Sequence, residues 1–165
     1  MSRDNTVGSR SEIDMAYIAG FLDGDGSLML QLKRRKDVKS RTRFMATVCF
    51  YQDSRHAEPL IWIRKILGIG YIFNRNDGMT ELRINGYETI AVILRKLLPY
   101  IKFKKAQARA LLKAVDILRK TPKRLLVQSM LSAVVDSIIK IQSHNYATKG
   151  KRSRRELLSV LGLTP

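Results

Sequence analysis

The chain contains few of the residues that would build a disulfide-linked or zinc-stabilised protein. Its 165 residues include one cysteine, Cys49, and two histidines, His56 and His144. One cysteine excludes an internal disulfide, and these three side chains together are too few for a structural zinc site. The sequence also lacks an apolar run long enough to span a bilayer, and residues 1–11 carry no apolar signal-peptide stretch. We therefore expect an intracellular protein with no membrane partner.

Acidic residues are also scarce. The chain has 31 lysines and arginines but only 14 aspartates and glutamates, which gives a net charge of +17. A surface with this much self-repulsion is typical of proteins that bind a polyanion. An anionic membrane fits less well, because no predicted helix combines a wide apolar face with a purely basic one. Nucleic acid is the expected partner, and a merely basic soluble protein is the alternative.

Apolar patterning predicts an α+β fold for the chain. The predicted elements are helices over 13–25, 57–67, 87–98, 104–120, 122–141 and from Ser153 to Gly162, and strands over 27–36, 43–52, 71–75 and 80–85. Two hairpins with interleaved helices favour an antiparallel sheet that carries its helices on one face. Ser11 is the expected N-cap of the first helix, and Thr121-Pro122 the expected start of the fifth. We expect a flexible N-terminus over 1–11 and one domain over 12–165, with a core over 12–120 and C-terminal helices over 121–165.

The first predicted hairpin is strongly basic. Residues 33–43 include seven basic side chains and one acid, Asp37. A two-stranded ribbon fits the major groove of B-DNA, where arginine and glutamine read base edges and lysine contacts phosphates. The alternative is a sheet edge that positive charge protects from aggregation. The basic ribbon is therefore a candidate DNA-binding surface.

The first predicted helix carries small residues at every fourth position: Ala16, Gly20 and Gly24. These three residues share one stripe of the helix. A glycine inside a helix costs about 1 kcal/mol relative to alanine, so some other interaction has to offset that cost. Close approach of a second helix along the stripe is the expected compensation.

The same helix ends in the acidic tetrapeptide Asp23-Gly24-Asp25-Gly26. Carboxylates are unfavourable at a helix C-terminus, where the helix dipole is negative. A divalent cation would remove this conflict, because hard cations bind carboxylate and carbonyl oxygens. If two copies of the helix pack along the small stripe, their acidic ends meet, and paired metal-binding carboxylates are typical of phosphodiester hydrolysis. The alternative is that both aspartates simply cap a turn.

The residues Ile18-Ala19-Gly20-Phe21-Leu22-Asp23-Gly24-Asp25-Gly26, followed by Ser27, closely resemble the signature of the LAGLIDADG homing endonucleases. The predicted order of helices and strands is also that family's order, and the similarity covers most of residues 12–120. The resemblance implies a saddle-shaped antiparallel sheet. Because the motif occurs once, the chain resembles the single-motif branch of the family, whose members assemble as homodimers.

The resemblance also implies roles for individual residues. It makes Asp25 the metal ligand, assisted by the Gly24 carbonyl, with Gln52 orienting solvent and Lys104 serving as the site lysine. It also implies a basic residue shortly after Gln52, and the sequence leaves open whether this is Arg55 or His56. The dimer interface is expected to include Ala16, Gly20, Phe21, Asp23 and Gly24.

Strand alternation gives the expected DNA-reading surface. The residues proposed for it are Gln31, Lys33, Arg35, Arg41, Arg43, Thr47, Arg75, Glu81 and Arg83. This choice depends on the strand register, since a slip of one residue would turn every side chain to the opposite face.

The function implied is that of a homing endonuclease. Such an enzyme cuts both strands of a long, roughly palindromic DNA site as a homodimer, and Mg²⁺ (or Mn²⁺) is its cofactor. An RNA maturase or a non-cleaving DNA- or RNA-binding protein of the same family is the main alternative, with intron RNA as a further partner. The Asp37-Val38-Lys39 fragment of another nuclease class lacks an upstream acidic partner. A basic ribosome-associated protein is the non-enzymatic alternative.

Overall fold

The computed structural model describes residues 5–34, 42–145 and 150–164. Its helices are α1 (Asn5–Asp25), α2 (Glu58–Leu67), α3 (Tyr87–Leu97), α4 (Lys105–Lys120), α5 (Gln128–His144) and α6 (Arg154–Val160). Its strands are β1 (Gly26–Arg34), β2 (Thr42–Asp53), β3 (Tyr71–Asn74) and β4 (Met79–Asn85). Short 3-10 turns lie at Ser54–His56 and Lys123–Leu125. Within the described ranges, no helix has both the length and the apolar character needed to cross a membrane.

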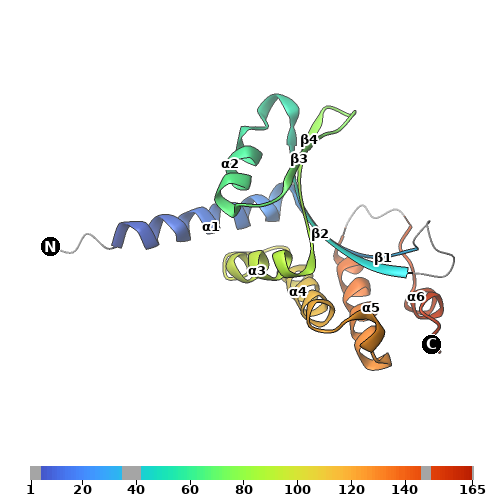
Figure 1. Ribbon diagram of the computed structural model, residues 1–165. Helices are drawn as coiled ribbons and strands as arrows, with labels where there is room; N and C mark the ends of the chain where they lie inside the picture. Colours follow the sequence, from blue (N-terminus) through green and yellow to red (C-terminus); the bar gives the residue numbers. More distant parts are fainter. Residues whose placement is uncertain (1–4, 35–41, 146–149, 165) are drawn as a thin grey trace.

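The four strands form one antiparallel sheet in the order β1-β2-β4-β3, and the sheet curves along its length (Figure 1). Two hairpins, β1-β2 and β3-β4, meet through the central pair β2 and β4. Helices α1 to α5 lie against one side of this sheet (Figure 1). The predicted α+β class and the predicted element order are therefore confirmed.

The face of the sheet turned toward the helices forms the core. Alternate residues of β1 and β2, namely Leu28, Leu30, Leu32, Phe44, Ala46, Val48 and Phe50, are all buried together with Leu82 and Ile84 of β4. Ile18, Ala19 and Leu22 of α1 and buried apolar side chains of α2, α3, α4, α5 and α6 complete the cluster. Burial of these side chains, each contributing roughly 1.5–3 kcal/mol for a large apolar residue, is the main force that holds the sheet to its helices.

Helix α1 is longer than predicted, because it starts at Asn5 and passes through Ser11. Ser11 is therefore not its N-cap, and residues 5–11 belong to the helix. No proline lies between Asn5 and the apolar turns that begin at Ile13, so the helix can continue without a break. At its other end α1 runs directly into β1, with Asp25 as the last helical residue and Gly26 as the first residue of the strand.

The C-terminal third differs from prediction at one point. Pro122 does not begin a long helix, because its backbone (φ −55°, ψ 143°) leads into the 3-10 turn, and α5 starts only at Gln128. A capping box begins α6, since the Ser153 side chain accepts from the Glu156 backbone N–H while the Glu156 side chain accepts from the Ser153 backbone N–H. α6 packs against α5.

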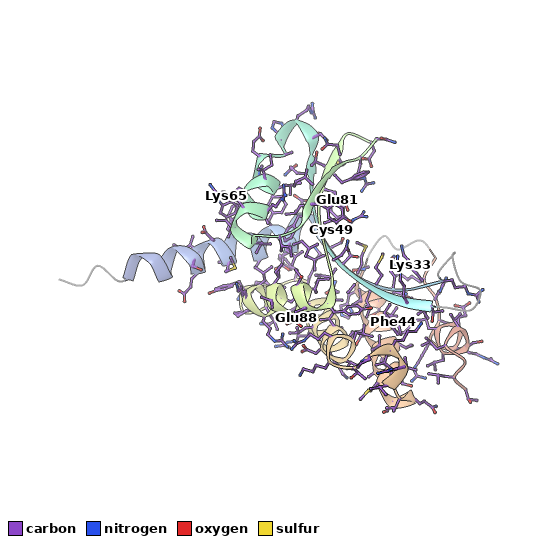
Figure 2. The ribbon with its side chains drawn as sticks, viewed as in Figure 1. Lys33, Phe44, Cys49, Lys65, Glu81 and Glu88 are labelled. Atoms are coloured by element: carbon purple, nitrogen blue, oxygen red, sulfur yellow. The ribbon has the colours of Figure 1, made fainter. Side chains whose placement is uncertain are left out.

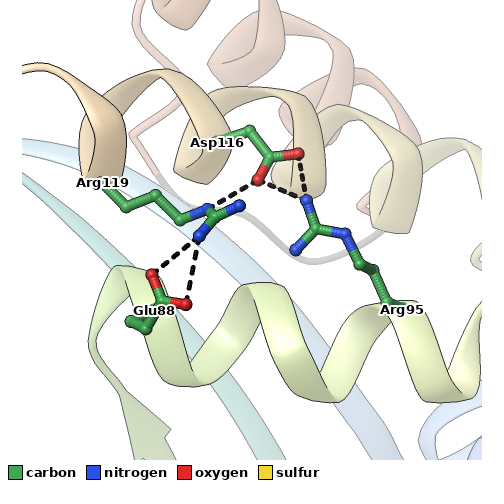
Figure 3. Close-up of polar contacts among 4 residues, drawn as sticks. All are labelled: Glu88, Arg95, Asp116 and Arg119. Carbon is green, nitrogen blue, oxygen red and sulfur yellow. Dashed lines mark hydrogen bonds and ion pairs between the residues drawn. The ribbon is translucent and has the colours of Figure 1, made fainter.

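An ionic network joins α3 to α4 on the outside of the molecule (Figure 3). Arg95 Nη2 donates to both Asp116 oxygens at 2.6 and 2.7 Å, and Arg119 Nε donates to the same carboxylate at 2.8 Å. Arg119 Nη1 also reaches the two Glu88 oxygens at 3.1 and 2.9 Å. Surface ion pairs of this kind contribute little singly, but a four-residue network with bidentate geometry fixes the relative position of the two helices. The network therefore helps to hold the C-terminal half of α4 against α3.

Candidate functional site

The C-terminal end of α1 is joined to the N-terminal end of α4 by the side chain of Asp23. Its carboxylate accepts hydrogen bonds from the backbone N–H groups of Lys102 (2.6 Å), Phe103 (3.1 Å) and Lys104 (2.9 Å). These groups lie at the start of α4, where backbone N–H groups lack helical partners and where a negative charge is favourable. Both carboxylate oxygens of Asp23 thus accept hydrogen bonds within its own chain.

Lys104 makes the complementary contact. Its Nζ donates to the carbonyl oxygens of Leu22 (3.0 Å), Asp23 and, more weakly, Gly24 (3.4 Å). These carbonyls belong to the last turn of α1, where they would otherwise lack donors. Burial lowers the pKa of Lys104, while the nearby Asp23 and Asp25 carboxylates oppose that shift. The predicted site lysine therefore lies at the end of the helix that carries the motif.

Asp25 and Gly24 are both exposed at this helix end. The exposed Asp25 carboxylate lies beside the Gly24 carbonyl, which Lys104 contacts only weakly, and these two oxygen donors are of the type that Mg²⁺, Mn²⁺ and Ca²⁺ prefer. The residues thus fit a divalent cation in chemical type. They are incomplete in number, because no three acidic, histidine or cysteine side chains gather around a metal-sized space in the described part of the chain. Since Mg²⁺ is bound through one or two carboxylates, a second Asp25 would complete the set.

Gln52 lies at the same end of the sheet. The β1-β2 register pairs Gly26 with Phe50, so Gln52 lies two residues beyond that pair, beside the end of α1. Its Oε1 accepts from the Asp53 backbone N–H at 2.9 Å, which fixes the amide and leaves its Nε2 as the remaining donor group. Alternation along β2 also places Gln52 on the same side of the strand as Phe50, the side that α1 covers.

Arg55 and His56 are the two candidates for the basic residue expected shortly after Gln52. Asp53 contacts one of them. Arg55 donates to the Asp53 carboxylate through its backbone N–H (2.9 Å), its Nε (3.0 Å) and its Nη2 (2.8 Å). The Arg55 guanidinium also lowers the pKa of Asp53. Arg55 is thus held to Asp53 although its side chain is 81% exposed, and His56 beside it is exposed as well.

The face of the sheet opposite the helices carries the predicted DNA-reading side chains. Gln31 pairs with Met45 and Lys33 pairs with Arg43, which confirms the register on which their assignment rested. Gln31, Lys33 and Arg43 are exposed, and Lys33 lies toward the far end of the β1-β2 hairpin (Figure 2). Arg75 is also exposed, follows β3, and lies over the ring of Tyr51 with 5.9 Å between the guanidinium carbon and the ring centre. Arg35 and Arg41 lie outside the described residues.

Two residues that were predicted to contact DNA, Thr47 and Glu81, are buried, so these two predictions are wrong. Thr47 is 2% exposed and donates to Asn85 Oδ1 at 2.9 Å, while Glu81 is also 2% exposed. Tyr51 and Phe73 flank Glu81 on the neighbouring strands. Alternation correctly gave the face of the sheet, but it could not show that large cross-strand neighbours cover the middle of that face. Neither side chain lies at the surface.

An open groove of about 1150 Å³ follows β1 from the end of α1 toward the basic hairpin. Asp23, Gly24 and Lys104 line one part of it, and Gln31, Lys33 and Arg75 line another. Gln107 of α4 and Ile138 and Gln142 of α5 line it as well, so the groove runs along the β1 edge of the sheet and joins the helix end to Gln31 and Lys33. A substrate large enough to contact the basic hairpin would also reach the motif.

The predicted small stripe is exposed in the single chain. Ala16 and Gly20 are at the surface, and a Cβ atom added to Gly20 or Gly24 would meet no neighbouring atom within 4 Å. Ile13 and Tyr17 on the same helix are 63% and 55% exposed. Phe21 differs from the others, because it is partly buried and packs on Phe50 with ring centres 6.2 Å apart.

Sequence reasoning missed Phe103, which is 85% exposed directly before Lys104. Phe103 is an apolar residue between Lys102 and Lys104, and an apolar residue inside a basic segment is the signal that could have identified it. This largely exposed phenylalanine adds to the apolar surface at the motif end of α1.

Comparisons with known proteins give a consistent result. The family model of the LAGLIDADG endonucleases matches residues 18–115, and the match begins at the first residue of the motif. The DNA endonuclease I-CvuI of Chlorella vulgaris is 31% identical over 153 residues, which make up 92% of this chain and 93% of that protein. The DNA endonuclease I-CreI of Chlamydomonas reinhardtii is 28% identical over 102 residues, 62% of each chain.

Solved structures resemble the chain as well. The crystal structure of I-CvuI in complex with the DNA target of I-CreI has a TM-score of 0.80 at 30% identity, and the match covers 94% of this chain and 99% of that one. The archaeal intron-encoded homing endonuclease I-Vdi141I, complexed with DNA, has a TM-score of 0.76 at 20% identity and covers 92% and 96%. This second likeness concerns the fold alone.

Proposed function

Because the chain belongs to the LAGLIDADG endonuclease family, we propose that it is a homing endonuclease that cuts both strands of a long, roughly palindromic DNA site as a homodimer with a divalent cation. The observation that carries this proposal is the end of α1. There Asp25 is exposed, while the neighbouring Asp23 is engaged by α4 and Lys104 covers the helix carbonyls. One acid is thus kept available at a site that a second copy of the chain would complete.

The homodimer is supported by the exposed side of α1. A helix with small residues at positions 16, 20 and 24 can approach an identical helix closely, because no Cβ branches separate the two backbones. Exposed Ile13 and Tyr17, with Phe103 at the other end, supply apolar surface that association would bury. A two-fold axis along this stripe would bring two Asp25 carboxylates together at the same end.

The cation would be held by Asp25 and the Gly24 carbonyl of each copy. When bound there, Mg²⁺ (or Mn²⁺) would supply Lewis-acid activation of a phosphodiester and neutralise its charge. The remaining steps belong to the residues around it. Lys104, fixed on the terminal carbonyls of α1, would stabilise negative charge that develops on the phosphate. Gln52 would orient solvent through its free amide group, and His56 is the basic residue that we assign to the same end of the site.

The DNA would lie along the sheet face opposite the helices. Gln31, Lys33, Arg43 and Arg75 are exposed on that side or at its rim, and a net charge of +17 favours binding of a polyphosphate. We expect a protein with such a substrate to act inside the cell that carries the DNA target.

The proposal is tested with two kinds of double-stranded DNA: the target with which I-CvuI was crystallised, and a random-sequence library. We expect selective enrichment of one long site from the library in the absence of divalent cations. We also expect cleavage of both strands of that site on addition of Mg²⁺. Enrichment without cleavage would indicate the family's non-cleaving binder, and enrichment of intron RNA over DNA would indicate a maturase. The absence of both enrichment and cleavage would contradict the proposal.

A further inference from the structure

A buried carboxylate lies in the middle of the DNA-facing side of the sheet. The Glu81 side chain is 3% exposed, and its Oε1 accepts from Arg83 Nε in a short ion pair. The Cys49 thiol lies on the same oxygen, with 3.5 Å between Sγ and Oε1. Figure 2 shows Glu81 and Cys49 close together on the central strands. A buried carboxylate is costly unless it is paired, so this acid requires its arginine.

The pairing fixes Arg83 more firmly than an ordinary surface arginine. Arg83 lies opposite Cys49 on β2 and opposite Tyr71 on β3, so its side chain rises between two neighbouring strands. If the guanidinium swung away toward a phosphate, Glu81 would remain buried and unpaired. Burial and the Glu81 charge raise the pKa of Cys49 to about 11, so the thiol stays protonated and donates to the same carboxylate. Arg83 is thus held in one direction before any ligand binds.

What Arg83 presents outward is a fork of donors. Its Nε faces Glu81, its side chain remains 39% exposed, and its two terminal nitrogens carry four N–H groups. In the major groove only guanine offers two acceptors side by side, O6 and N7. Adenine and cytosine place an amino donor at that edge, and thymine offers one acceptor beside a methyl group. A pre-oriented fork therefore discriminates for guanine.

We propose that Arg83, positioned by Glu81, reads one guanine in each half of the DNA site and sets the base preference at that position. This inference rests on the proposed function, and it gives Glu81 a positioning role instead of the direct DNA contact that alternation had predicted. Because the sheet occurs once per chain, two copies would read two guanines related by the symmetry of the site.

The test is selection of bound sequences from a random-sequence duplex library, followed by comparison of base preferences between variants. The wild-type chain should enrich a motif with guanine at a symmetric pair of positions. Arg83→Lys keeps the charge but loses the fork, so the guanine preference there should fall by about 5- to 150-fold while other positions keep theirs. Glu81→Gln should weaken the same position without lowering total DNA affinity, because the arginine is freed but retained. Arg64→Lys, an exposed substitution on α2, is the matched control and should leave every position unchanged.

The outcomes separate the two levels of the proposal. A wild-type chain that enriches no sequence contradicts the proposed function, and this inference with it. A wild-type motif that Arg83→Lys leaves intact contradicts the inference alone. So does a loss of preference spread evenly over all positions, since this would mean that Arg83 only supports the fold. If Glu81→Gln does not fold, Arg83→Lys decides the question by itself.

Discussion

Asp23 and Lys104 cap each other's helices. The Asp23 carboxylate accepts from the Lys104 backbone N–H at 2.9 Å, and the Lys104 side chain donates to the Asp23 carbonyl oxygen. Each residue thereby satisfies backbone groups that its partner's helix leaves without hydrogen bonds. The two residues are 81 positions apart in the sequence, so this exchange ties the motif helix to the C-terminal half of the fold.

Loss of either residue should lower the stability of the fold, and the two losses should not be additive. We expect Asp23→Asn to cost about 1–2 kcal/mol and Lys104→Met about 1–3 kcal/mol, because each leaves helix-terminal groups without partners. The double variant should cost less than the sum by about 0.5 kcal/mol or more, since the second change removes groups already disconnected. Urea unfolding measures all three. Lys102→Met, an exposed lysine that contributes only its backbone, should change stability by less than about 0.5 kcal/mol; strict additivity would argue against the exchange.

Asp25→Asn should abolish cleavage and spare binding. The substitution removes the charge that would hold the cation but keeps the size of the side chain, so we expect the cleavage rate to fall at least about 100-fold. Gel-shift affinity for the selected site, measured without divalent cations, should change little. Glu58→Gln, an exposed acid on α2, serves as the control and should cleave normally. Cleavage that survives in Asp25→Asn would remove this residue from the mechanism.

Gly20→Leu should block self-association without harming the folded chain. The added side chain enters open space in the single chain, and leucine favours the helix by up to about 1 kcal/mol relative to glycine. In a dimer the same side chain would separate the two helices, so the dissociation constant should rise at least about tenfold. Sedimentation over a range of concentrations measures this. Lys113→Leu, at an exposed position of α4, controls for added surface leucine; a wild-type chain that sediments as a monomer throughout would refute the dimer.

Gly26→Ala should lower the stability of the folded chain, whereas Gly20→Ala should raise it. The two glycines are only six residues apart. A Cβ on Gly26 would lie 2.8 Å from both the Cα and the carbonyl oxygen of Leu22, and those backbone atoms cannot move aside cheaply. We expect a loss of about 1–3 kcal/mol for Gly26→Ala. Gly20→Ala should instead raise the stability of the monomer by up to about 1 kcal/mol. Urea unfolding of both variants at low protein concentration measures the two stability changes. Equal changes for the two variants would contradict the tight junction between α1 and β1.

Cys49 should be unreactive until the pH is high. Burial, assisted by the Glu81 charge, raises the pKa of its thiol from 9.0 to about 11. At pH 8 this lowers the thiolate fraction about 100-fold, and iodoacetamide should alkylate the folded chain more slowly than the urea-unfolded chain by at least that factor. Because the folded pKa is raised, the associated stability is complete below pH 9 and is lost as the pH rises from 9 toward 11. Similar alkylation rates in both states would show that the thiol is accessible.

The fold was accessible from the sequence because periodicity and turn residues reported it directly. Phe44, Ala46, Val48 and Phe50 alternate along β2 and are all buried, and Gly68 and Gly78 have positive φ at a helix end and in a hairpin turn. Pro122 misled, because a proline can begin a helix or a 3-10 turn with equally good local geometry. The start of α1 was set too late, because Ser11 is a good N-cap only if the preceding residues leave the helix.

The site was only partly accessible from the sequence. The motif and its resemblance drew attention to Asp25, Gln52 and Lys104, whose roles remain predictions. The contacts of Asp23 with the α4 backbone depend on residues about 80 positions away, and no local pattern reports such a distance. Glu81 was misread for a related reason. Its burial comes from neighbours on two other strands, and strand alternation takes no account of them.

No loop separates α1 from β1. Recognition of DNA bases by the strand and cleavage at the helix end would therefore be coupled. Asp25 ends the helix and Gly26 begins the strand, so under the proposed function a displacement of β1 on bound DNA would also move the Asp25 carboxylate. A poorly matched site can still attract the basic surface, yet it would leave the acid misdirected. Tolerance of mismatches should therefore be wider in a binding measurement than in a cleavage measurement made on the same DNA.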